Sequence, residues 1–271
     1  MLPTVHRLEF KVLAQGMQPL RILHISDLHL TPRRRDLLRF IPSWGDLAPD
    51  LIVSTGDHIA HEDAMPLLIE ALRPLSNIPG FFVFGSNDYF APTFKNPLRY
   101  LFPIKRGVPR GRRLPTELLE LGLESLGWKV LHDSIARTNI KGVQIELRGT
   151  NDAHIGFDTY HVTKGIRSNS DLSIGVTHSP YQRVLEAFAL DGVDLVLAGH
   201  THGGQIRIPW RGGTRALTTN CDLPRWRARG LTAVPGQAPL HVSAGLGSSP
   251  LHPPRFLNPP SVTLIKIVGA G

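Results

Sequence analysis

The sequence predicts an α/β (or α+β) fold, because short apolar runs alternate with segments of helical character along the 271 residues. The runs are rich in Val, Ile, Leu and Phe and are too short for amphipathic helices, as expected for strands covered on both faces. A hydrophobic fraction of 41% and a charged fraction of 19% are ordinary for a globular protein and argue against disorder. Since no repeat or linker divides the chain, we expect a single domain over residues 1–271.

Each predicted element is a short segment with a clear type. Seven apolar runs are predicted strands: Leu20–Ile25, Leu51–Ser54, Phe81–Phe84, Val143–Leu147, Leu172–Val176, Val193–Ala198 and His241–Ala244. Four segments between them are predicted helices: Asp36–Phe40, Glu62–Leu75, Thr116–Leu126 and Pro180–Leu190. Strands that alternate with helices favour βαβ units.

The chain is basic, with a net charge of +8 and a pI near 10.1, which favours anionic partners such as phosphoesters, nucleic acid or phospholipid headgroups. A basic insertion loop at about 89–115 holds seven basic residues and no acidic one. Within it we expect Arg110, Arg112 and Arg113 to bind an anionic substrate, although a solvated surface loop explains the same composition.

The first 18 residues carry charges and lack the apolar core and cleavage site of a signal peptide. Nowhere do about 18 apolar residues follow one another, so no integral membrane segment is predicted. These features predict a cytoplasmic protein, for which peripheral contact with an anionic membrane is compatible with the charge. Nothing in the sequence indicates an oligomeric state.

Side chains that bind metals follow five of the predicted strands directly. They are Asp27 and His29, Asp57, Asn87 and Asp88, His178, and His200 and His202. The carboxyl ends of strands form the edge at which ligand sites lie in open α/β sheets. We therefore expect these side chains to meet there.

The mixture of carboxylate oxygen and imidazole nitrogen suits Mn, Fe, Zn or Co better than Ca. With Cys221 as the one cysteine, a structural zinc site of the cysteine type is excluded. Asp27 and His29 are two residues apart, as are His200 and His202, so in extended segments each pair would point to one side. A carboxylate such as Asp57 can bridge two cations about 3.5–4 Å apart.

These motifs, in their order from about Arg21 to His202, resemble those of calcineurin-like metallophosphoesterases, most of all the bacterial phosphodiesterase branch. The resemblance implies a four-layer αββα sandwich of two mixed β-sheets flanked by helices, with two divalent metal ions (Mn, Fe or Zn) per chain. By motif, one metal is assigned to Asp27, His29, Asp57 and His202, and the other to Asp57, Asn87, His178 and His200.

One motif departs from the family pattern, since Gly85-Ser86-Asn87-Asp88 stands where relatives usually have Gly-Asn-His-Asp/Glu. Aligned without a gap, Ser86 takes the metal-binding Asn position. Slipped by one residue, Asn87 stays a ligand and Asp88 takes the His position. An amide oxygen is the better ligand, which favours the slip and makes Asp88 the candidate catalytic acid.

The predicted function is hydrolysis of phosphodiesters, and less readily of phosphomonoesters, by in-line attack of a hydroxide that bridges the metals. Two alternatives stay open. The first is a binding module that retains metal but turns over weakly, as the altered motif suggests. The second is a protein that binds nucleic acid or anionic lipid through its positive charge.

Overall fold

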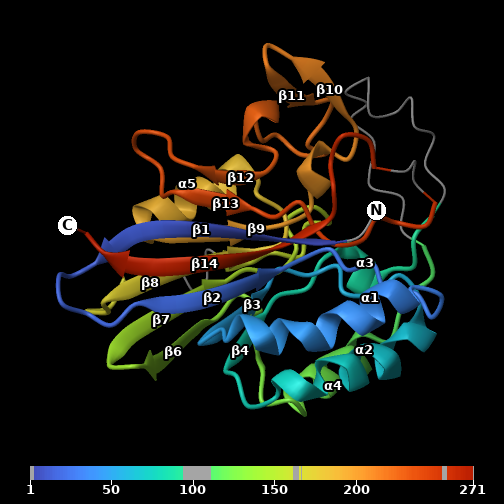
Figure 1. Ribbon diagram of the computed structural model, residues 1–271, viewed down its shortest axis with the longest axis horizontal. Helices are drawn as coiled ribbons and strands as arrows, with labels where there is room; N and C mark the ends of the chain where they lie inside the picture. Colours follow the sequence, from blue (N-terminus) through green and yellow to red (C-terminus); the bar gives the residue numbers. More distant parts are fainter. Residues whose placement is uncertain (1–2, 94–110, 161–164, 166, 252–254, 271) are drawn as a thin grey trace.

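The computed structural model describes residues 3–93, 111–160, 165, 167–251 and 255–270. Two six-stranded sheets form its centre (Figure 1). The first has the spatial order β1 (Thr4–Leu13), β14 (Ser261–Gly269), β2 (Leu20–Ile25), β3 (Leu51–Ser54), β4 (Gly80–Phe82) and β5 (Lys129–Val130). The second has the order β12 (Gly230–Thr232), β13 (Leu240–Val242), β9 (Leu195–Ala198), β8 (Leu172–Thr177), β7 (Val143–Gly149) and β6 (Ile135–Ile140).

Both sheets are mixed. β2, β3, β4 and β5 are parallel, whereas β14 runs antiparallel to β2. β7, β8, β9 and β13 are parallel, with β6 and β12 antiparallel at the two edges. The parallel strands of each sheet therefore end on one edge, and these edges carry the predicted ligands.

The two sheets stack face to face with helices outside them, which confirms the αββα sandwich. Helices α1 (Arg35–Phe40), α2 (Met65–Leu72) and α4 (Thr116–Glu124) cover the first sheet, and α5 (Gln182–Leu190) covers the second (Figure 1). Short elements complete the fold: η1 (Ile41–Leu47), η2 (Glu62–Ala64), η3 (Arg73–Leu75), α3 (Ser86–Tyr89), η6 (His202–Gly204), β10 (Arg207–Trp210), β11 (Gly213–Ala216) and η7 (Arg225–Arg227).

Alternation along the strands divides the core into layers. On β2, Ile22 faces the second sheet, where it joins a fully buried cluster with Ile174 of β8 and Leu197 of β9. Leu23 and Ile25 face the helices instead. Burial of one such side chain contributes about 1.5–3 kcal/mol, so this double-sided packing fixes where each strand ends.

The predicted strands and helices are all present with boundaries shifted by a few residues, but several elements were missed. The predicted helix Glu62–Leu75 is divided into η2, α2 and η3, because Pro66 and Pro74 each stand in a first turn and interrupt the backbone hydrogen bonds. Strand β1 was missed because it alternates charged and apolar residues at the edge of its sheet. No helix in the described part of the chain is long and apolar enough to cross a membrane.

Candidate metal centre

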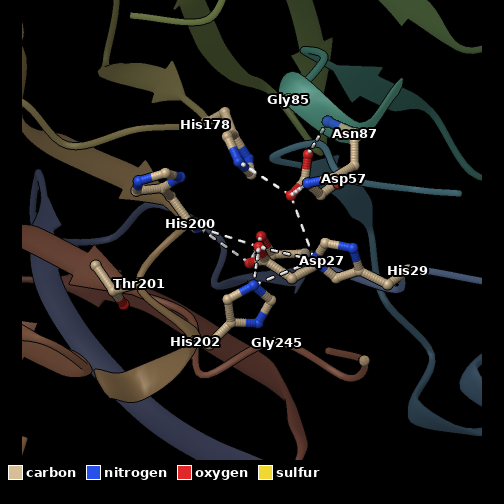
Figure 2. A network of polar contacts seen from close by, with 12 residues as sticks. Asp27, His29, Asp57, Gly85, Asn87, His178, His200, Thr201, His202 and Gly245 are labelled. Atoms are coloured by element: carbon tan, nitrogen blue, oxygen red, sulfur yellow. Dashed lines mark hydrogen bonds and ion pairs between the residues drawn. The ribbon is translucent and has the colours of Figure 1, made fainter. Parts of the chain in front are cut away.

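The carboxyl ends of β2 and β3 in one sheet and of β8 and β9 in the other meet at one place. The register pairs Ile25 with Ser54, and Thr177 with Ala198, so neighbouring strands end side by side. Figure 2 shows side chains from both sheets pointing toward one another. The structure brings together all seven predicted ligand residues: Asp27, His29, Asp57, Asn87, His178, His200 and His202.

Asp27, His29, Asp57 and His202 are called here the first half of the centre. One ligand atom from each lies within 4.8 Å of all the others. His29 Nε2 is 3.3 Å from Asp57 Oδ2 and 3.1 Å from His202 Nε2, which in turn is 3.6 Å from Asp27 Oδ1. Ligands about 2.1 Å from a tetrahedral cation are about 3.4 Å apart, so these three distances are compatible with a shared cation.

Asp57, Asn87, His178 and His200 are called the second half. Asp57 belongs to both halves, because its Oδ2 is 3.3 Å from His29 Nε2 and 3.5 Å from His178 Nε2. Asn87 donates its backbone N–H to Asp57 Oδ1 at 2.8 Å and its side-chain amide to Oδ2 at 2.7 Å. The Asp57 carboxylate thus lies in contact with residues of both halves.

Backbone carbonyls determine the tautomers of two histidines in the second half. His178 Nδ1 lies 2.7 Å from the carbonyl oxygen of Thr55 and must donate its proton there. The other nitrogen, Nε2, is buried 3.5 Å from Asp57 Oδ2 and makes no hydrogen bond with the described residues. His200 Nε2 donates to the carbonyl of Asn220 at 3.2 Å, leaving Nδ1 for a cation. Metal-binding histidines typically have their other nitrogen held in this way.

The electrostatics of the cluster also suit a cation. Burial raises the pKa of Asp57, but His178 and His29 outweigh it and hold this pKa well below its usual range. Burial lowers the pKa of His178, but the Asp57 carboxylate outweighs it, so the pKa lies well above its usual value. Burial, reinforced by neighbouring histidines, holds the pKa values of His200 and His202 well below normal. The ionised Asp57 and the neutral His200 and His202 are in the protonation state in which a cation binds, whereas His178 must release a proton before it can bind one.

The backbone adopts the left-handed region at five of the ligand residues. The φ angles are +50° at Asp27, +41° at His29, +55° at Asp57, +69° at His200 and +49° at His202. The Asp-x-His and His-x-His pairs therefore do not lie in extended segments, the condition under which the sequence would point each pair to one side. Such φ angles are uncommon outside glycine and cost of order 1–3 kcal/mol each, and they cluster at functional sites.

Two glycines permit the close approach of the ligand loops. A Cβ on Gly85 would lie 2.3 Å from Asp57 Oδ1 and 2.7 Å from His178 Nε2. A Cβ on Gly199 would lie 1.9 Å from Ser26 Oγ, which donates to Asp27 Oδ2 at 2.6 Å. Any larger residue at either position would displace a ligand.

Comparison with known proteins decides the family. The profile of the calcineurin-like phosphoesterase family matches residues 20–204, about two-thirds of the chain. The chain is a calcineurin-like phosphoesterase. This phosphoesterase is 26% identical to the uncharacterized metallophosphoesterase YkuE of Bacillus subtilis, with 97% of its chain and 84% of the relative covered.

Two further relatives have names that state an activity. The phosphoesterase is 28% identical to phosphodiesterase YaeI of Escherichia coli, with coverage of 97% of its own chain and 87% of the relative. It is 26% identical to UDP-2,3-diacylglucosamine pyrophosphatase LpxG of Chlamydia trachomatis, with coverage of 91% and 83%. The family resemblance expected from the motifs is confirmed.

Asp88 of this phosphoesterase lies behind the ligand loop. Its carboxylate is fully buried and accepts backbone N–H groups from Asp57 at 2.8 Å, His58 at 2.7 Å and Gly85 at 3.0 Å. His58 Nδ1 also lies 3.1 Å from it. These bonds occupy both oxygens and favour a role in positioning Asp57, whereas the catalytic-acid assignment stays a prediction.

Of the three arginines predicted to bind substrate, two lie within the described residues. Arg110 lies outside the described residues. Arg112 is exposed and forms a two-pronged ion pair with Glu62, with N–O distances of 3.0 and 2.9 Å. Arg113 is exposed and pairs through its backbone with Phe90. The assignment of these arginines to substrate binding stays a prediction.

Some residues around the centre were missed by sequence reasoning. Thr55 and Asn220 contribute through backbone carbonyls, for which sequence contains no signal. Arg255 places Nη2 3.4 Å from His202 Nδ1, and burial lowers its pKa to about 10. The ring centroid of His154 also lies 4.4 Å from that of His200.

Proposed function

We propose that this phosphoesterase is a two-metal hydrolase that prefers phosphodiesters to phosphomonoesters. The observation that carries the proposal is the position of Asp57 Oδ2, which has a histidine nitrogen within 3.5 Å on either side. A carboxylate shared between two ligand sets is what a two-metal centre needs. The names of YaeI and LpxG support a substrate with a phosphoric ester or anhydride bond.

Asp27, His29, Asp57 and His202 would hold one cation, and Asp57, Asn87, His178 and His200 the other. The buried His178 Nε2 beside Asp57 Oδ2 and the convergent donors of the first half support this division. When bound, divalent cations supply positive charge to a phosphoryl group and lower the pKa of water. We infer Mn, Fe or Zn from the mixture of oxygen and nitrogen donors.

The chain's own residues have defined tasks in this proposal. The carbonyls of Thr55 and Asn220 each hold one ring nitrogen of His178 and His200, which leaves the other nitrogen to bind a cation. Asp88 fixes the turn at Asp57 through backbone N–H groups. A net charge of +8 attracts an anionic ester, and diesters of lipids and of nucleic acids both meet this description.

The test is hydrolysis of bis-p-nitrophenyl phosphate and p-nitrophenyl phosphate by metal-stripped protein, titrated with Mn²⁺, Zn²⁺ and Fe²⁺. Asp57→Asn is the decisive variant, and Asp46→Asn at an exposed position is its matched control. We expect metal-dependent diesterase activity that falls by about 10³-fold or more in Asp57→Asn, since several kcal/mol of charge stabilisation are lost.

Each other outcome identifies an alternative. Tight metal binding without turnover on either ester would contradict the hydrolase and indicate the binding module suggested by the altered Gly85–Asp88 motif. Turnover that is unchanged in Asp57→Asn would exclude a role of the Asp57 carboxylate as a ligand shared by two cations. Faster hydrolysis of the monoester would overturn the diester preference alone.

A further inference from the structure

The segment from Gln205 to Thr232 differs in composition from the rest of the molecule. It contains six arginines, one aspartate and no other charged residue. It begins with the β10–β11 hairpin, which Figure 1 shows projecting beyond the sheets at the end away from α2 and α4. It ends at η7 and β12.

Large apolar side chains on and around this hairpin are exposed to solvent. In the described part of the chain, every exposed Trp or Phe lies here: Trp210 (49% exposed), Trp226 (61%) and Phe256 (56%). The side chains of Ile208 and Leu257 are 37% and 42% exposed. We call these five residues the hairpin surface. Soluble proteins rarely leave large aromatic groups gathered in water without a binding role.

Several contacts join the elements that carry this surface. Ile206 and Phe256 form a parallel β-bridge, in which the carbonyl oxygen of Phe256 accepts the backbone N–H of Arg207 at 3.0 Å. η7 packs against β11. The Arg229 guanidinium donates to Asn258 Oδ1 at 3.1 Å and so joins the segment after η7 to the one after Phe256.

The hairpin is also held firmly to the metal centre. The buried Arg207 donates to the carbonyl oxygens of Gly203, at 2.8 Å, and Thr214, at 2.7 Å. Gly203 directly follows the ligand His202. A partner that binds the hairpin surface would therefore lie beside the centre in a fixed orientation.

Arginines stand next to the exposed indoles. The guanidinium carbons of Arg215 and Arg211 lie 5.2 and 5.9 Å from the ring centroid of Trp210, within cation–π range. The exposed Arg225 is adjacent to Trp226. Indole rings at the level of lipid headgroups, with arginines that attract anionic headgroups, are typical of proteins that bind a membrane surface.

We propose that the hairpin surface docks this phosphoesterase onto a bilayer that carries anionic lipid headgroups. Trp210 and Trp226 would enter the interface while Arg211, Arg215 and Arg225 contact headgroup phosphates. Nucleic acid is a poorer fit, because the aliphatic Ile208 and Leu257 have no use in stacking against bases, whereas acyl chains accommodate them. The proposal does not depend on the enzymatic activity.

The test is flotation of the full chain with vesicles of phosphatidylcholine containing 30 mol% phosphatidylglycerol, compared with pure phosphatidylcholine. We expect at least tenfold stronger partitioning onto the anionic vesicles, which weakens as salt is raised. In the double variant Trp210→Ser with Trp226→Ser, partitioning onto the anionic vesicles should fall by about tenfold or more. The matched control is Leu118→Ser with Leu121→Ser on α4, where the leucines are 61% and 62% exposed.

A second variant, Arg211→Glu with Arg215→Glu, should abolish the preference for anionic vesicles without removing an apolar side chain. Hydrolysis of a soluble diester and the circular dichroism spectrum check that each variant is folded. No binding of the wild-type chain to anionic vesicles would overturn the proposal, as would equal loss in the α4 control. Tight binding to a single-stranded oligonucleotide without vesicle binding would identify nucleic acid, and not a membrane, as the partner of the hairpin surface.

Discussion

The two halves of the metal centre differ in how closely they follow the family pattern. The first half has two carboxylates and two imidazoles whose ligand atoms all lie within 4.8 Å of one another. The second half contains the altered motif, and there the Asn87 amide donates to Asp57 Oδ2 at 2.7 Å. Only the second half therefore requires a rearrangement, namely a turn of this amide, before its oxygen can face a cation.

The two halves also differ in their supports. Asp27 in the first half accepts the Ser26 hydroxyl at 2.6 Å and the His200 backbone N–H at 3.1 Å, so a side chain and a backbone group both anchor it. His178 in the second half depends on the carbonyl of Thr55. This difference leads us to expect that a cation binds more tightly in the first half than in the second.

The largest effects should come from removing one histidine of each half. His202→Ala and His178→Ala should each retain one cation per chain and lose about 10³-fold in kcat/KM, because the remaining cation alone stabilises the transition state poorly. Metal content after dialysis, together with diester hydrolysis, measures both effects. His61→Ala, whose side chain is 50% exposed, is the control. If His202→Ala lost all metal and His178→Ala lost none, the centre would be mononuclear.

A smaller effect is expected from Asp88→Asn, which tests the turn shared by both halves. Asparagine keeps one acceptor oxygen and turns an N–H₂ group toward backbone N–H groups that now reach the carboxylate at 2.7–3.0 Å. Urea denaturation of the metal-free protein should show a loss of about 3 kcal/mol in the free energy of unfolding. Asp63→Asn, with a side chain 71% exposed, should change it by less than about 0.5 kcal/mol.

The same variant decides between the two roles of Asp88. A positioning role predicts reduced stability together with reduced metal affinity. A catalytic-acid role predicts lower kcat with unchanged stability, and it would show a greater loss on esters with poor leaving groups than on p-nitrophenyl esters.

Much of the site could be predicted from the sequence because its ligands follow strands directly. Apolar runs locate β2, β3, β8 and β9, and the chemistry of α/β sheets puts their carboxyl ends together. The residue types alone then suggest a metal. The positive φ angles at residues such as Asp27 and His200 were beyond prediction, since they depend on contacts between loops.

Other features depend on contacts between distant residues. Arg255 reaches His202 across 53 positions, and Asp88 meets the Asp57 N–H across 31. An exposed carboxylate and a buried acceptor of backbone N–H groups have the same letter in a sequence, so the hydrogen bonds of Asp88 could not be predicted from it. His24 is a buried core histidine whose hydrogen-bond partner, His241, comes from the other sheet.

The smallest effect concerns the core beneath the second half. His24 Nδ1 lies 2.8 Å from His241 Nδ1, and His24 Nε2 lies 3.0 Å from the hydroxyl of Thr55, the residue that holds His178. Burial, with His6 nearby, lowers the pKa of His241 to about 3. Burial and His241 hold the pKa of His24 well below normal.

Below their ordinary pKa of 6.5, these two histidines take up protons in the unfolded chain but not in the folded one. Stability is therefore complete above pH 6.5 and falls as the pH drops toward 3, by about 1.4 kcal/mol for each histidine between pH 7.5 and 5.5. Urea denaturation at both pH values measures the fall. Replacing the pair by His24→Leu with His241→Leu should remove this part of the pH dependence, whereas His61→Leu should not. An equal pH dependence in the double variant would mean that His24 and His241 take up protons in the folded protein as well. A charged pair would then lie beneath Thr55, the residue that holds His178.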